Sequence, residues 1–122
     1  MDVVDWGDVE PVAVGQMESR TAQLGVMVVT RHVIPAGFDS TPFYRGLPND
    51  MCPCEHWCLL VRGQMRYRYV DGRTQTVEAG QVFRVAPGHL ADVLEDSELI
   101  EFTDAEDYAR KAAHLADAAE RG

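Results

Sequence analysis

Hydrophobic and polar positions alternate over short runs from residue 25 to residue 102, and glycine or proline separates most of these runs. The run at 25–34, GVMVVTRHVI, is rich in β-branched residues and ends at Pro35, which predicts a strand. Asp71-Gly72 stands between two such runs and predicts a hairpin turn. Further strands are expected at 55–61, 65–70, 73–77, 81–86, 91–94 and 99–102. Short strands at this spacing are typical of an antiparallel sandwich or barrel.

The segments outside these runs have weaker patterns. Residues 12–14 are expected to form a short edge strand, whereas residues 20–24 show no clear period. Residues 38–50 contain two prolines and a glycine, which predicts a loop or a broken strand. Thr103 is followed three residues later by Glu106, as in a capping box, so one helix is expected from about residue 104 to residue 121.

The composition indicates one globular domain over residues 1–122, because 46% of the residues are hydrophobic. The formal net charge is −9, and phosphate backbones and anionic membrane surfaces repel such a chain. Nucleic acid and membranes are therefore not expected partners. No apolar run approaches the roughly 20 residues that span a bilayer. The first residues lack the basic and apolar regions of a signal peptide, so a cytoplasmic location is expected.

All three cysteines lie in one stretch, Cys52-Pro-Cys-Glu-His-Trp-Cys58. Their odd number and tight spacing argue for reduced thiols rather than a disulfide framework. In an extended segment side chains alternate between two faces, which puts Cys52, Cys54, His56 and Cys58 on one face. Thiolate and imidazole are ligands that zinc prefers, so this face is a candidate metal site. The alternative is that the cysteines are buried as small hydrophobic residues, since their spacing differs from that of structural zinc sites.

Two stretches resemble the conserved motifs of the cupin superfamily. The first runs from His56 through Gly63 to Asp71-Gly72, and the second runs from Ala79-Gly80 through Pro87-Gly88 to His89. The two stretches are similar to those of small bacterial cupins with one histidine in each motif. The resemblance implies a double-stranded β-helix, or jelly roll, with its core at residues 25–102 and a C-terminal helix at 104–121. It also implies a homodimer, which would cover exposed edge strands.

The chain departs from the usual cupin metal site of three histidines and one glutamate. The usual cupin motif would have a glutamate seven residues before Gly63, where this chain has His56. A histidine would stand three residues after Gly88, where this chain has Ala91. His89 has the same strand parity as position 91 and is expected to point inward. The standard iron site is therefore absent.

The favoured hypothesis is a small-molecule enzyme of the cupin type, centred on His56 and His89. Cys52, Cys54, His56 and His89 are the expected metal ligands, with Cys58 as a further candidate, and this set favours Zn²⁺ over Fe²⁺. The alternative without a cofactor is an isomerase, cyclase or lyase in which His56 and His89 act as acid and base. Tyr67 or Tyr69 would then donate a hydrogen bond to an oxyanion.

A third hypothesis is a non-catalytic module that binds or senses a small ligand, because fold alone does not separate it from an enzyme. The residues expected to line its pocket are Phe43, Tyr44, Trp57 and Phe83. A redox role for the clustered cysteines is a further option. His32 is expected to be a half-exposed strand residue, and His114 a solvated residue of the helix surface.

Overall fold

The computed structural model describes residues 2–121, apart from the side chains of residue 115 and of residues 118–121. Within this range the strands form two antiparallel sheets, one of six strands in the order β1-β2-β3-β9-β4-β7 and one of three in the order β6-β5-β8. The strands are β1 (Val12–Val14), β2 (Met17–Leu24), β3 (Met27–Ile34), β4 (His56–Arg62), β5 (Gln64–Tyr69), β6 (Thr74–Glu78), β7 (Val82–Val85), β8 (His89–Val93) and β9 (Ser97–Asp104).

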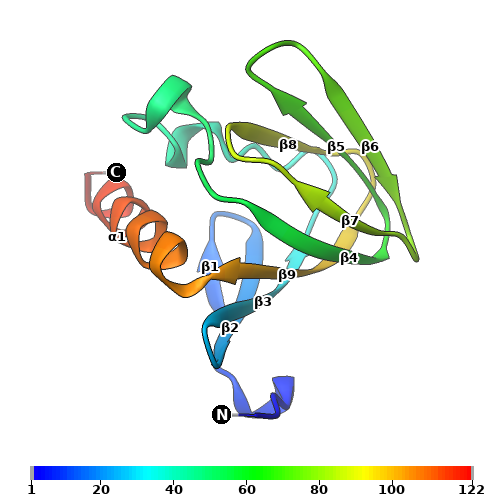
Figure 1. Ribbon diagram of the computed structural model, residues 1–122, viewed down its shortest axis with the longest axis vertical. Coiled ribbons are helices and arrows are strands. Elements are labelled where there is room, and N and C mark those ends of the chain that lie inside the picture. The colour runs from blue at the N-terminus through cyan, green and yellow to red at the C-terminus, as the bar shows by residue number, and fades with distance from the viewer. Residues whose placement is uncertain (1, 122) are drawn as a thin grey trace.

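The helices are α1 (Ala105–Arg121) and three short 3₁₀ turns, η1 (Trp6–Asp8), η2 (Thr41–Phe43) and η3 (Pro48–Asp50). Helix α1 follows β9 directly and packs beside β9, β3 and η2, so it covers one side of the sheets (Figure 1). Among the described residues, no helix is both long and apolar enough to cross a bilayer. The predicted arrangement of strands followed by one helix is confirmed.

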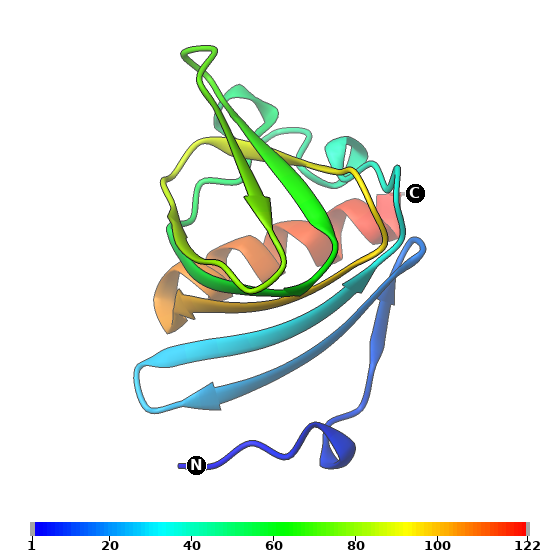
Figure 2. The same cartoon turned by 90° about the vertical axis from the view of Figure 1, so that its right-hand side faces the viewer.

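Strands far apart in the sequence pair side by side. β9 lies between β3 and β4, and β8 pairs with β5 in the smaller sheet. Figure 2 shows β5, β6 and β8 of the smaller sheet above the larger sheet, with the β2–β3 hairpin extending beyond β9. The inward side chains of both sheets form the hydrophobic core, which includes Ile34, Cys58, Leu60, Met65, Tyr67, Val77, Val85, Val93 and Leu99.

Strand β4 shows how alternation positions the site. His56, Cys58 and Leu60 are buried, whereas Trp57 and Leu59 between them are exposed. The pairing of β4 with β9 shifts register between Leu60 and Arg62, which indicates a bulge. Because the bulge comes after Leu60, the two-residue period is unbroken from His56 to Leu60.

Gly63 allows β4 to turn tightly into β5. Its φ is 96°, a left-handed conformation that glycine adopts without steric cost. A Cβ atom added there would lie 2.2 Å from Ser97 Oγ and 2.5 Å from the carbonyl oxygen of Asp96. The start of β9 therefore passes too close for any side chain at this position.

Strand β2 was not predicted from the sequence, because residues 20–24 lack a hydrophobic period. It pairs with β3 over its whole length, from Glu18 opposite Val33 to Leu24 opposite Met27. Its inward residues Met17, Ser19 and Thr21 line a cavity, and of these only Met17 also packs against the apolar core. Polar residues are tolerated there, and this hides the alternation of the strand.

Candidate metal centre and cavity

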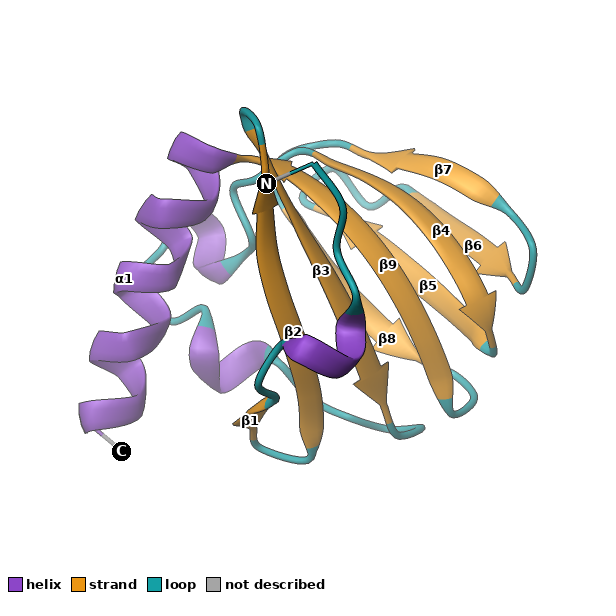
Figure 3. Cartoon of the chain, turned by 90° about the horizontal axis from the view of Figure 1, so that it is seen from below, coloured by secondary structure: helices purple, strands orange, loops and turns teal. Residues whose placement is uncertain are grey.

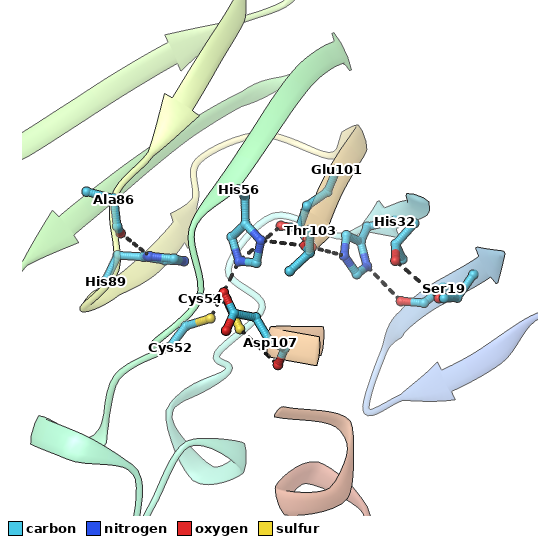
Figure 4. Close-up of polar contacts among 12 residues, drawn as sticks. Ser19, His32, Cys52, Cys54, His56, Ala86, His89, Glu101, Thr103 and Asp107 are labelled. Atoms are coloured by element: carbon cyan, nitrogen blue, oxygen red, sulfur yellow. Dashed lines mark hydrogen bonds and ion pairs between the residues drawn. The ribbon is translucent and has the colours of Figure 1, made fainter. Parts of the chain in front are cut away.

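Cys52 and His89 are paired through their backbones. The N–H of Cys52 donates to the carbonyl oxygen of His89 at 2.9 Å, and the N–H groups of Gly88 and His89 donate to the carbonyl oxygen of Cys52 at 2.9 and 3.2 Å. This bridge joins the segment before β4 to the start of β8. His56 begins β4, and ligand atoms of Cys52, His56 and His89 lie within 4.8 Å of one another (Figure 4). All three residues are buried.

Each histidine of this cluster is held through its Nδ1 atom. His89 Nδ1 donates to the carbonyl oxygen of Ala86 at 2.8 Å, and a carbonyl can only accept, so Nε2 carries the lone pair of the neutral ring. His56 Nδ1 hydrogen-bonds with Thr103 Oγ1 at 2.8 Å, and its Nε2 lies 3.5 Å from Cys52 Sγ. Outer hydrogen bonds of this kind orient imidazoles that bind metal ions.

Glu101 on β9 lies between two histidines. Its Oε2 accepts a hydrogen bond from His32 Nε2 at 3.2 Å, and its Oε1 lies 3.6 Å from His56 Nε2. Ser19 Oγ lies 2.7 Å from the other ring nitrogen of His32 (Figure 4). Burial by itself would raise the pKa of Glu101, but His56, Lys111 and the His32 hydrogen bond outweigh it and hold that pKa well below its usual range. An ionised carboxylate therefore lies beside the cluster.

The three thiols differ in their surroundings. A hydrogen bond from Cys54, together with Lys111 and the two histidines, lowers the pKa of Cys52 despite its burial. The same contact with Cys52, with burial next, raises the pKa of Cys54. Burial raises the pKa of Cys58, which lies in the hydrophobic core. Cys52 is therefore the thiol best placed to act as a thiolate ligand.

A cavity of about 240 Å³ opens beside the cluster. Tyr67 lies in its wall, and the buried hydroxyl of this residue has no hydrogen-bond partner among the described residues. Buried hydroxyls are rarely left unpaired, so this group is free to bind a ligand. The polar residues of the wall are Ser19, Thr21, Thr30, His32, Ser40, Tyr44, His56, Tyr67, His89, Glu101, Tyr108 and Lys111. The rest of the wall is apolar, with Met17, Ile34, Phe38, Met65, Val93 and Leu99 among its members.

The structure brings together some of the residues that the sequence suggested for the site. Cys52, His56 and His89 form the cluster, and Tyr44 and Tyr67 lie in the cavity wall with the two histidines. Cys54 is buried but lies outside the three-residue cluster, and its Sγ lies 3.5 Å from the carbonyl oxygen of Asp107.

Three expected pocket residues lie elsewhere. Trp57 is 42% exposed on the outer face of β4, because it has the opposite parity to His56. Phe43 stacks on Phe38, and Phe83 packs against the core beside Tyr67. These three residues are not among those that line the cavity.

Several residues of the site were not identified from the sequence. His32 is not simply a half-exposed residue, since both of its ring nitrogens are engaged and it lies in the cavity wall. Thr103 was expected to cap α1, but Asp104 does so by accepting from the N–H groups of Glu106 and Asp107.

Two residues of helix α1 that face inward, Lys111 and His114, were also missed. Lys111 is buried and lines the cavity. His114 was expected to be solvated, but its Nε2 is buried and has no partner among the described residues. The helix has only a thin apolar stripe, as a helix on the protein surface would. Nothing in the sequence therefore indicated that these two polar side chains turn toward the sheets.

No family model and no curated protein matches this sequence. Solved structures do match the fold. An RmlC-like cupin from Shewanella frigidimarina aligns with a TM-score of 0.62 and 17% identity over 86% of this chain and 93% of the other. Ectoine synthase from P. lautus aligns with a TM-score of 0.62 and 12% identity over 85% of this chain and 78% of the other.

Oxalate decarboxylase from Lactobacillus farciminis aligns with a TM-score of 0.59 and 13% identity over 83% of this chain. The chain spans about a third of that enzyme, with 32% of it covered. Identities this low establish the architecture and leave activity open. Two facing antiparallel sheets, one C-terminal helix and these likenesses together show that the chain has the cupin fold.

Proposed function

We propose that the protein is a metal-dependent enzyme that acts on a small organic molecule inside the cavity. The observation that carries the proposal is the buried cluster of Cys52, His56 and His89, whose ligand atoms lie within 4.8 Å of one another. Buried polar groups need partners, and a bound cation would satisfy the thiolate and both ring nitrogens at once. The hydrogen bonds of His56 and His89 fix both rings before a metal binds.

The donor set favours Zn²⁺ over Fe²⁺, because one thiolate and two imidazoles are typical zinc ligands. When bound, the ion would act as a Lewis acid that polarises an oxygen atom of the substrate. The sequence argument against iron rested on a carboxylate missing from the ligand set, and the cluster of Cys52, His56 and His89 contains none. Glu101 lies next to this cluster, with Oε1 3.6 Å from His56 Nε2, so iron is the second ion to be measured.

The residues around the cluster suit the activation of a substrate carbonyl. The Glu101 carboxylate is ionised, but the groups that hold its pKa well below the usual range also make it a weak base, so its role is to orient the His32 and His56 rings. The unpartnered Tyr67 hydroxyl can donate a hydrogen bond to the carbonyl oxygen, because burial holds the pKa of Tyr67 well above its usual range and keeps it protonated.

A second candidate is a binding protein without catalysis, and the mostly apolar wall of the cavity favours it. Apolar pockets with few polar groups bind small ligands whether or not a reaction follows. In that case a ligand that stabilises the protein would be recovered unchanged. The metal-free enzyme, with His56 and His89 as acid and base, is the third candidate.

Elemental analysis of the purified protein tests the proposal. Zinc and iron are measured in the wild type and in the Cys52→Ser, His56→Ala and His89→Ala variants. We expect close to one metal ion per chain in the wild type and a loss of at least tenfold in each variant. His114→Ala and Cys54→Ser are the matched controls, since both residues lie outside the cluster, and they should keep the metal.

Other outcomes separate the candidates. A wild-type protein that contains no metal, and that takes up neither ion on addition, would contradict the proposal. Turnover that depends on both histidines would then favour the metal-free enzyme. If Cys54→Ser loses the metal as fully as Cys52→Ser, the thiol ligand has been wrongly assigned.

A further inference from the structure

Lys111 is the only lysine in the chain, and the other ten basic residues are arginines. It lies on helix α1, where a lysine is normally solvated, yet its exposed fraction is only 7%. The side chain lines the same cavity as His56, His89 and Tyr67. Figure 3 shows α1 along one side of the sheets. A buried ammonium group is costly unless something compensates its charge.

The structure compensates this charge only in part. Among the described residues, no hydrogen bond or ion pair within 4.0 Å holds the Lys111 ammonium, whereas Arg110 beside it pairs with Asp107. Burial works to lower the pKa of Lys111, but Tyr44, Cys52 and Glu101 outweigh it and hold that pKa above its usual range. The amine is therefore a protonated donor, and this argues against a role as a nucleophile that forms a Schiff base.

Two polar groups of the cavity wall thus lack a partner. The Tyr67 hydroxyl, supplied by β5, is buried and unpaired, and the Lys111 ammonium, supplied by α1, makes no hydrogen bond or ion pair among the described residues. The wall that surrounds them is largely aliphatic and aromatic. A ligand that satisfies this arrangement has an anionic end, a hydrogen-bonding oxygen and an apolar body.

We propose that Lys111 binds the carboxylate group of a small substrate whose remaining body is apolar. The reaction of this substrate rests on the proposed function, but its binding by Lys111 does not.

The test compares ligands of the same shape that differ in charge. Phenylacetate and phenylacetamide are titrated into the wild type, into Lys111→Met and into Arg110→Met by calorimetry. We expect the wild type to bind phenylacetate at least tenfold more tightly than the amide. Lys111→Met should lose this preference and bind the two equally. Arg110→Met removes the same charge from an exposed neighbour on the same helix, so it should behave as the wild type.

Two results would overturn the inference. The first is a wild type without preference for phenylacetate, and the second is a preference that persists in Lys111→Met. Metal content is measured in the same samples. Normal metal content without a carboxylate preference contradicts this inference alone. A preference that depends on Lys111 in protein without metal contradicts the proposed metal centre alone.

A second measurement uses the wild type and so does not depend on the folding of a variant. Lys111 and the α-amino group are the only primary amines of the chain. Reductive methylation followed by peptide mass spectrometry reports on both. Phenylacetate should slow methylation of Lys111 at least tenfold, without affecting the α-amino group, and phenylacetamide should not. Equal methylation of Lys111 with and without phenylacetate would also overturn the inference.

Discussion

The backbones of Cys52 and His89 pair directly, with the N–H of Cys52 2.9 Å from the carbonyl oxygen of His89. This contact joins two segments that are far apart in the sequence and sets a thiol beside an imidazole. Because the backbone makes the contact, the distance between the two side chains depends on the conformation of the Pro87-Gly88 corner. The first prediction follows from that dependence.

Gly88→Ala should weaken Zn²⁺ binding at least tenfold. Gly88 has φ of 81°, and its N–H donates to the carbonyl oxygen of Cys52 at 2.9 Å, so a side chain at this position strains the corner and displaces His89. Gly80→Ala is the control, since its φ of 88° imposes a similar strain away from the cluster. Both variants should lose about 1 kcal/mol of stability. Competition with a chromophoric chelator measures the affinity, and equal affinities in the two variants would contradict the prediction.

Thr103→Val should lower Zn²⁺ affinity by about tenfold to 100-fold, because it removes the hydrogen-bond partner that orients the His56 ring. Valine has nearly the same shape, so the fold should be retained. Thr74→Val on β6 is the matched control, as that residue is exposed and far from the cluster in the sequence. Chelator competition and circular dichroism are the two measurements. An unchanged affinity in Thr103→Val would show that the hydrogen bond has no positioning role.

Tyr67→Phe should leave the ligand-free protein as stable as the wild type, or more stable by up to about 2 kcal/mol. Its hydroxyl is buried without a partner, so removing it removes only a desolvation cost. Tyr69→Phe should instead lose about 1 kcal/mol, because the Tyr69 hydroxyl donates to Gln75 and accepts from the N–H of Ala86. Urea denaturation compares the two. A larger loss in Tyr67→Phe would mean that this hydroxyl is satisfied after all.

Gly63→Ala should destabilise the protein by more than about 2 kcal/mol, or prevent folding. The added Cβ meets the backbone and side chain at the start of β9, and φ is unfavourable as well. Gly72→Ala is the control, because its φ of 90° is similar but no atom lies within 4 Å of the added Cβ. That variant should lose about 1 kcal/mol. Thermal unfolding measures both, and similar losses would refute the steric argument.

The sequence was sufficient to predict the fold and the centre of the candidate site. Strand alternation put His56 and Cys58 on one buried face, and the Pro-Gly corner pointed to His89. It could not show which cysteine joins the histidines. Cys52 and Cys54 share a parity, and only the bridge between Cys52 and His89 distinguishes them.

The remaining site residues were hidden by their local context. Glu101 is one acidic residue among 20 acidic ones, and it can be recognised only once β9 is known to face its inward side toward His56. Thr103 has the sequence features of a helix cap, but the cap falls on Asp104 and Thr103 stays within the strand. Lys111 required the orientation of α1 against the sheets, which depends on tertiary packing rather than on helix periodicity.

The bulge between Leu60 and Arg62 has a consequence for how such a sequence can diverge. Before the bulge, the number of residues in β4 decides which side chains face the cavity. Beyond the bulge, it does not. One residue inserted between Cys52 and His56 would lengthen the segment that joins the Cys52–His89 bridge to β4 and displace the Cys52 thiol from His56. One residue inserted beyond the bulge would leave every cavity residue of β4 in place. Related chains should therefore vary in length at the β4–β5 end and keep the interval from Cys52 to Leu60 constant.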